Sequence, residues 1–256
     1  MSIEPTCEYC GLVDKTRCKT RSASEDCPHA PVSGKAPVVQ SGVLAGLRRQ
    51  HYGAILADPP WSFATRSDKG MDRSPENHYD CMTLDEIKAM PVHEIAAKDC
   101  ILFMWIIDTH VPQALEVLEA WGFAYKTKGF NWVKLNEKFE DYPDEDQNAK
   151  ADKAFFKGMG FWTRANPEDC WLATRGRPKR VDKGVRRLIV AELREHSRKP
   201  DGIYDRIEAL VDGPYCELFA RTARPGWDQA GNEVGKFGLR YESPSDEELA
   251  EIEDLV

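Results

Sequence analysis

The feature that most constrains the fold is a short apolar run that leads into an acidic residue and two prolines. Residues 52–57 (YGAILA) have the length and apolar character of a buried parallel strand, and Asp58-Pro59-Pro60-Trp61 follows directly. In open α/β sheets, ligands bind at the edge where the strands have their carboxyl ends. The sequence therefore predicts that Asp58 lies at the mouth of a binding site.

The two prolines give this corner an unusual chemistry. Pro59 pushes Asp58 into an extended conformation, and both prolines remove a backbone donor while leaving their carbonyls free. Such a corner can accept both N–H groups of an amino group on an aromatic heterocycle, with Trp61 stacked on the ring or walling the pocket. The alternative is a strand that simply ends in a proline turn, with Asp58 as a cap and Trp61 in the core.

The rest of the chain alternates between strand and helix patterns. Apolar runs predict further strands over residues 100–107, 130–135, 168–174, 188–193 and 215–220. Helical spacing predicts a helix over 111–121 and another from 201 to about 211, and a capping box at 83–86 opens a short helix that Pro91 ends. This alternation predicts an α/β fold with a mostly parallel, doubly wound sheet.

Composition describes a soluble globular protein with one substantial domain. The chain has 256 residues, of which 41% are hydrophobic and 30% charged. No apolar run approaches the ~20 residues of a membrane span, and the amino terminus is polar rather than signal-like. We expect a cysteine-rich leader over 1–35, the main domain over 36–242 and an acidic tail over 243–256, in a monomer or a homodimer.

Half of the eight cysteines lie in the first 27 residues. Cys7 and Cys10, followed by glycine, have the spacing of half a zinc site. We expect a structural zinc ion bound by Cys7, Cys10, Cys18 and Cys27, or by three of these with His29. The alternative is free thiols, and the other four cysteines are interpreted as core residues.

Basic residues concentrate in one part of a chain whose net charge is −8. Residues 175–199 contain ten Lys/Arg against three acids, a local concentration of positive charge that is more informative than the average. Near the end of this stretch, Lys199 and Pro200 precede a predicted helix. A lysine at the N-terminus of a helix can bind a carboxylate or a phosphate. The alternative at Lys199 is a solvent-facing basic turn.

Several motifs, in order, resemble the family of N6-adenine methyltransferases that includes the eukaryotic messenger-RNA adenosine methylases and phage and bacterial relatives. They are Ala57-Asp58-Pro59-Pro60-Trp61, Tyr79-x3-Thr83-x2-Glu86-Ile87, Leu102-Phe103-Met104-Trp105, Trp121-Gly122-Phe123, Trp132-Val133-Lys134, Glu195-His196-Ser197-Arg198-Lys199-Pro200, Tyr204, Glu217-Leu218-Phe219-Ala220-Arg221 and Gly231-Asn232. The resemblance covers residues from about 52 to 232. Each is weak alone, but in this order they are highly specific.

The resemblance implies a Rossmann-like fold with helices on both faces of the sheet and a permuted motif order. It implies S-adenosylmethionine as the methyl donor and the exocyclic N6 amine of adenine as the acceptor. Asp58 and the Pro59 carbonyl are then expected to hold the amine, with Pro60 and Trp61 completing the motif and Trp61 flanking the base. The cofactor-binding residues expected by the resemblance are Asp58, Lys199, Arg221, Asn232 and Glu233.

The compact chain favours a phage or bacterial enzyme, in the cytoplasm of a bacterial or phage-infected cell, that acts on DNA with a flipped-out base. On a DNA substrate, the phosphates are expected to contact Arg175, Arg177, Lys179 and Arg180. We expect direct in-line methyl transfer, because no cysteine or serine arrangement indicates a covalent intermediate. Three alternatives stay open. They are an RNA adenosine methyltransferase, an inactive nucleic-acid adaptor of the same fold, and a chain whose cysteine-rich leader is the functional module.

Overall fold

The protein folds around one seven-stranded sheet, whose strand order is β5-β3-β4-β2-β1-β6-β7. The structure, a computed structural model, describes residues 38–40, 42–61, 82–136, 154–158, 160, 162–195 and 198–237. The predicted zinc ligands, the cysteine-rich leader and the acidic tail lie outside these residues.

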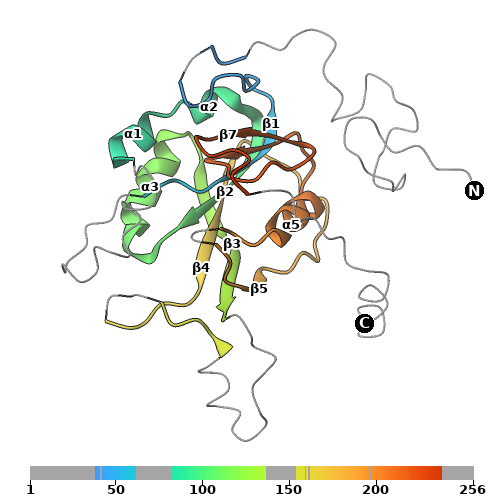
Figure 1. Ribbon diagram of the computed structural model, residues 1–256. Coiled ribbons are helices and arrows are strands. Elements are labelled where there is room, and N and C mark those ends of the chain that lie inside the picture. The colour runs from blue at the N-terminus through green and yellow to red at the C-terminus, as the bar shows by residue number, and fades with distance from the viewer. Residues whose placement is uncertain are drawn as a thin grey trace, which may run out of the picture.

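Helices separate the strands up to Leu135, as the sequence indicates, but later described strands also follow one another directly along the chain; Figure 1 shows their arrangement. They are β1 (Tyr52–Ala57), α1 (Leu84–Ala89), α2 (Val92–Ile95), β2 (Ala96–Ile106), the 3-10 helix η3 (Asp108–His110), α3 (Val111–Ala120), β3 (Ala124–Leu135), β4 (Glu168–Arg175), β5 (Leu188–Glu192), α5 (Gly202–Leu210), β6 (Tyr215–Leu218) and β7 (Trp227–Ala230).

All of the pairings in the sheet are parallel except those of β4, which runs antiparallel to β2 and β3. The prediction of a mostly parallel sheet is therefore confirmed. Because β4 is reversed, its first residue, Glu168, lies at the edge where the other strands end. Its last residue, Arg175, lies toward the edge where they begin. We call these the carboxyl edge and the amino edge.

Helices cover both faces of the sheet, as predicted. Alternate residues of β1 and β2 point to opposite faces, so that Ile55 and Leu102 join one core while Leu56 and Phe103 join the other. The first core packs against α1, α2 and α3, and the second packs against α5 (Figure 1). The fold is the Rossmann-like arrangement expected of a methyltransferase.

Local sequence signals explain several boundaries. Thr83 caps α1, with its side chain accepting from the Glu86 N–H and the Glu86 carboxylate accepting from the Thr83 N–H, which is the predicted capping box. Gly122, with φ +80°, ends α3 in a left-handed conformation. Among the described helices, none is long and apolar enough to cross a membrane.

Candidate functional site

The candidate site is built on an interior strand of the sheet, β1, which lies between β2 and β6. Asp58 follows the last residue of β1, and its side chain retains 27% exposure at the carboxyl edge. The backbone here is tightly bonded: the Pro59 carbonyl accepts from the Trp61 N–H (2.8 Å) and the Pro60 carbonyl from the Met82 N–H (3.1 Å). The expectation that both proline carbonyls are free is therefore wrong, although a carbonyl oxygen can accept a second hydrogen bond.

Trp61 belongs to the core, as the second interpretation of the proline corner expected. Its side chain is 5% exposed, and its indole N–H donates to the carbonyl of Trp105 at 3.2 Å. Its ring lies 5.8 Å from that of His110, tilted by 46°. Trp61 thus ties the end of β1 to the end of β2 and fixes the base of the corner that carries Asp58.

Lys199 reaches the same corner from the segment that precedes α5. Its Nζ lies 2.8 Å from Asp58 Oδ2 and 3.3 Å from Glu168 Oε2. The ammonium group also sits 5.5 Å from the centre of the Trp105 ring, within cation–π range. The fold thus brings Asp58 and Lys199 together although 141 positions separate them in sequence.

A second lysine extends this network. Lys134, on β3, pairs with Glu168 Oε1, so that one carboxylate holds the ammonium groups of both lysines. Burial alone would raise the pKa of Glu168, but the charges of Lys199 and Lys134 outweigh it, and the pKa lies below its ordinary value. The site therefore contains two fixed cations and two carboxylates, Asp58 and Glu168.

A third carboxyl group lies beneath the site in a different protonation state. Glu217 on β6 is paired in register with Leu56, is 9% exposed, and accepts from the Tyr204 hydroxyl at 2.9 Å. Burial, with smaller contributions from the charges of Asp58 and Asp201, raises the pKa of Glu217 to about 8. At neutral pH Glu217 is thus largely protonated and adds little negative charge beside Asp58.

The remaining predicted cofactor-binding residues gather where β6 and β7 end, at the same edge. Arg221 Nε lies 3.1 Å from Glu233 Oε2. Asn232, the residue before Glu233 in the chain, is exposed. Gly231 lets the two strand ends approach: a Cβ there would lie 2.7 Å from the Ala220 nitrogen and oxygen. A carboxylate, a guanidinium and an amide are therefore presented together along this edge.

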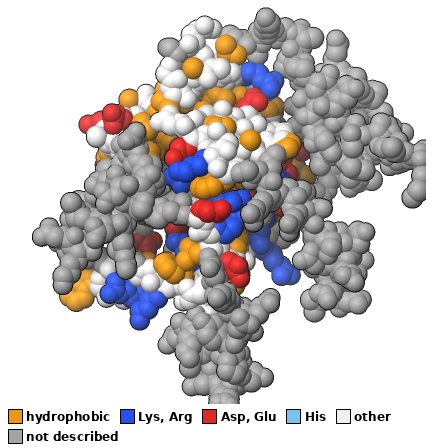
Figure 2. Space-filling model, in the orientation of Figure 1, with side chains coloured by type: hydrophobic (Ala, Val, Ile, Leu, Met, Phe, Trp, Pro, Cys, Tyr) orange, Lys and Arg blue, Asp and Glu red, His pale blue; other side chains and the backbone are white. Residues whose placement is uncertain are grey.

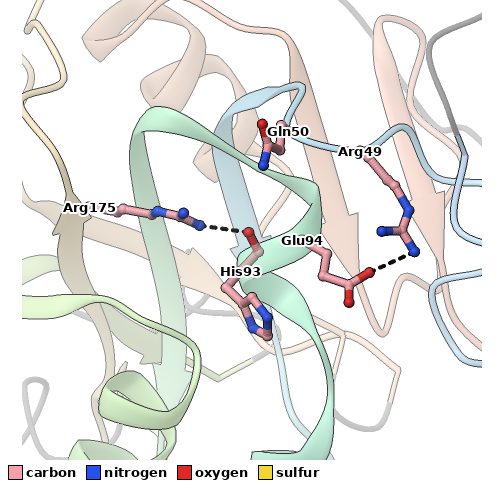
Figure 3. Close-up of a pocket in the computed structure, with 5 residues that line it drawn as sticks. All are labelled: Arg49, Gln50, His93, Glu94 and Arg175. Atoms are coloured by element: carbon pink, nitrogen blue, oxygen red, sulfur yellow. Dashed lines mark hydrogen bonds and ion pairs between the residues drawn. The ribbon is translucent and has the colours of Figure 1, made fainter.

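The predicted phosphate-binding residues lie elsewhere. Arg175 is near the amino edge, where its Nη1 donates to the His93 carbonyl at 2.6 Å. It lines a pocket of about 500 Å³ with Arg49, Gln50, His93 and Glu94, and Arg49 pairs with Glu94 at 2.9 Å (Figure 3). Arg177, Lys179 and Arg180 follow as exposed residues. The structure separates this group from Asp58.

Charge on the surface is mixed. On the face shown in Figure 2, acidic and basic side chains lie next to one another near the middle of the described surface. Within the described ranges, no cluster of three or more His, Cys, Asp or Glu side chains could hold a metal ion. Cys100, Cys170 and Cys216 are buried free thiols, as expected of core residues.

Sequence reasoning assigned no role to Glu168, Lys134 or Glu217, although Lys134 and Glu217 lie within the resembling motifs. Glu217 and Glu168 share the signal of a charged residue in a strand that is otherwise largely buried. Lys134 has no such signal, because most residues of β3 are exposed or half-buried. Glu168 was hardest to find, because only the reversed direction of β4 places its first residue beside Lys199.

Comparisons with known proteins agree with this geometry. The family model MT-A70 matches residues 52–233. The Type II methyltransferase M.MunI of a Mycoplasma species is 29% identical over 210 residues, which cover 75% of this chain and 82% of that protein. An N(6)-adenosine-methyltransferase MT-A70-like protein of Arabidopsis thaliana is 30% identical over 195 residues, which cover 73% of this chain and 24% of that protein.

The human N(6)-adenosine-methyltransferase catalytic subunit METTL3 is 29% identical over 193 residues. These cover 73% of this chain but only 29% of the human protein, so the chain spans less than a third of either adenosine methyltransferase. The matched region contains every part of the candidate site, from β1 through Asp58 to Glu233. The chain belongs to the MT-A70 family of methyltransferases.

Proposed function

We propose that the protein transfers the methyl group of S-adenosylmethionine to the N6 amine of adenine in DNA. The observation that carries this proposal is the pairing of Asp58 with Lys199 at the carboxyl edge, 2.8 Å apart. It places a carboxylate and an ammonium group together where open α/β sheets bind their ligands.

The side chains at this edge suit the methyl donor. Lys199 would face the methionine carboxylate, Asp58 would accept from the methionine amino group, and Arg221, Asn232 and Glu233 would surround the ribose. Glu233 is a carboxylate, so it can accept hydrogen bonds from ribose hydroxyls but cannot donate. The bound cofactor would supply an electrophilic methyl group on a sulfonium centre.

The role of the protein toward adenine is to orient the amine. The amine lone pair is delocalised into the ring, so acceptors that hold its N–H groups favour a geometry in which the lone pair is localised on nitrogen. Asp58 and the remaining acceptor capacity of the Pro59 carbonyl would do this, with the main chain fixed by the hydrogen bonds to Trp61 and Met82. The nitrogen would gain its bond to the methyl carbon as the carbon–sulfur bond breaks and a thioether leaves, and it would lose one proton, to water or to Asp58.

Direct transfer fits the surrounding residues better than a covalent enzyme intermediate. Cys170 is buried, and burial together with the charge of Asp58 raises its thiol pKa well above the ordinary value. The thiolate required of a nucleophile is therefore disfavoured.

The fraction of each relative's length that this chain matches favours DNA as the substrate. The type II methyltransferase is matched over 82% of its length, whereas the adenosine methyltransferases are matched over 24% and 29% of theirs. RNA is the second candidate, because those relatives act on adenosine and are equally similar where they match. A cytoplasmic location, a monomeric or homodimeric state and a zinc-binding leader stay predictions.

Labelled methyl transfer to DNA and RNA oligonucleotides of one adenine-containing sequence tests the proposal. The product nucleoside is identified by mass spectrometry after digestion. We expect N6-methyldeoxyadenosine, formed at least ten times faster than the RNA product. Equal rates would remove the preference for DNA. Binding of both oligonucleotides without transfer to either would favour the inactive adaptor.

A further inference from the structure

The connection between β4 and β5 begins at the amino edge, away from Asp58, and returns toward the carboxyl edge, where Leu188 pairs in register with Asn131 of β3. Residues 175–187 contain seven Lys/Arg and a single acid, Asp182. We use the name remote basic surface for the exposed cations at the start of the connection, which are Arg177, Lys179 and Arg180. Arg187 is not included, because its carbonyl accepts from the N–H of Asn131, which pairs with Asp169 near the carboxyl edge. Arg175 is excluded, since its guanidinium is bonded to the His93 carbonyl.

The backbone of this connection is held in place. The Arg177 N–H donates to Asp99 Oδ1 at 2.7 Å, and the Val181 N–H donates to the Leu210 carbonyl at 2.8 Å. Arg206 on α5 donates to the carbonyls of Arg186 (2.7 Å) and Leu188 (2.6 Å). The cations are thus presented from an anchored segment.

Nearby acids do not neutralise these side chains. Asp99 and Asp182 accept from backbone N–H groups of the connection, and no carboxylate of the described residues forms an ion pair with the remote basic surface. Like charges therefore accumulate here, and a polyanion would relieve their repulsion.

The distance from the catalytic edge follows from β4. Glu168 contacts Lys199, and Arg175 lies seven residues further along the strand. At a rise of ~3.3 Å per residue this separation is about 23 Å, or about seven base pairs of duplex. On its way to the carboxyl edge the connection leads into the edge strand β5, which pairs with the last residues of β3 and exposes Leu188, Val190 and Glu192.

We propose that the remote basic surface binds the phosphate backbone of the substrate nucleic acid about seven base pairs from the target adenine. This inference rests on the proposed function for the identity of the polyanion. The inference goes beyond the proposed function because it assigns a second contact with the nucleic acid, outside the methyl-transfer site, that only long substrates can reach.

Substrate length and salt dependence test the inference. The variant is Arg177→Gln/Lys179→Gln/Arg180→Gln in the full chain, and Lys88→Gln on α1, which packs on the opposite face of the sheet, is the control. Binding is measured to a 30-base-pair duplex without adenine in its central region. Methyl transfer is measured on a 30-base-pair duplex with a central target, and on a closed hairpin whose target lies within four base pairs of either end.

We expect the triple variant to bind the long duplex at least tenfold more weakly, with the slope of log K against log salt reduced by about two to three. Its kcat/KM should fall about tenfold on the long duplex and stay within twofold of wild type on the hairpin, with unchanged thermal unfolding. Equal losses on both substrates, or an unchanged salt slope, would overturn the inference. Absence of methyl transfer by the wild type would contradict the proposed function alone, because the binding measurement still tests the surface.

Discussion

Glu168 is the residue that holds the two lysines of the site in place. Its two oxygens contact Lys134 and Lys199, whose side chains are 14% and 18% exposed. Two ammonium groups this close repel one another unless a carboxylate lies between them. Glu168 is therefore a positioning residue for Lys199.

Replacing Glu168 with glutamine keeps the shape of the side chain but removes its charge. We expect Glu168→Gln to lower the free energy of unfolding by about 2 kcal/mol and to weaken binding of S-adenosylmethionine about tenfold. Adding Lys134→Met should recover part of the stability, because it removes the repelling cation. A double-mutant cycle by urea unfolding measures this coupling, and strictly additive effects would contradict the network.

Glu217 makes the stability of the protein depend on pH. Its pKa in the folded protein is about 8, above the ~4.3 of an unfolded glutamate, so the folded state retains a proton that the unfolded state has lost. The wild type should therefore lose stability as pH rises from about 5 to 8, by at most about 1.4 kcal/mol per pH unit from this group.

Glu217→Gln tests this dependence, because the amide oxygen can still accept from the Tyr204 hydroxyl. We expect the free energy of unfolding of the variant to fall less steeply between pH 5 and pH 8. Parallel profiles for the two proteins, measured by urea unfolding at each pH, would show that Glu217 titrates normally.

At the scale of the elements, the ends of β6 and β7 form the corner that carries Arg221, Asn232 and Glu233. The close approach of the two strands depends on Gly231, where any side chain would meet the backbone of Ala220. We expect Gly231→Ala to weaken cofactor binding at least tenfold and to lower stability by about 1 to 3 kcal/mol. Calorimetric titration and thermal unfolding measure the two effects.

Gly202→Ala is the matched control. Gly202 begins α5, has no heavy atom within 4 Å of a Cβ placed on it, and has no positive φ. The alanine should leave binding unchanged and raise stability slightly, since alanine favours a helix more than glycine does. If Gly231→Ala and Gly202→Ala had the same effects on cofactor binding and stability, the corner would not depend on steric contact at Gly231.

Strong local signals predicted most of the elements. The capping box at Thr83 and Glu86, the helical spacing before Gly122 and the apolar run before Asp58 all correspond to observed elements. The start of β3 was missed, because Ala124 to Gly129 is largely exposed and has no apolar pattern. The strand β7 was missed because it has only four residues within a glycine-rich segment.

Site residues could be predicted where a local sequence motif indicates their chemistry. Residues whose position depends on the direction of a strand in the sheet could not. The proline corner and the lysine ahead of a helix singled out Asp58 and Lys199, and the structure brings these two side chains into contact, while their roles stay predictions. Arg175 lies toward the opposite edge because β4 runs antiparallel to its neighbours, and no local sequence pattern predicts that direction. The same reversal brings Glu168 into the site.

At the scale of the whole molecule, cofactor binding should stabilise the entire fold, because the site joins β1, β4, β6 and the segment before α5. With S-adenosylhomocysteine at one hundred times its Kd, we expect about 2.7 kcal/mol of added stability and a rise in Tm of about 5 to 10 °C. Asn232→Ala should reduce the gain at the same concentration by about 1.4 kcal/mol, the equivalent of a tenfold weaker Kd. Because Asn232 is exposed, its unliganded Tm should not change.

The most direct test of the central claim is single-turnover methyl transfer to adenine-containing DNA by Asp58→Asn, compared with wild type and with the Glu86→Gln control on α1. The asparagine keeps the shape of the side chain and one acceptor oxygen but loses the carboxylate that faces Lys199. We predict a fall of at least a hundredfold in the rate of N6-methyladenine formation, with DNA binding within threefold of wild type and with Glu86→Gln unaffected. A rate within fivefold of wild type would contradict the assignment of methyl transfer to this edge of the sheet.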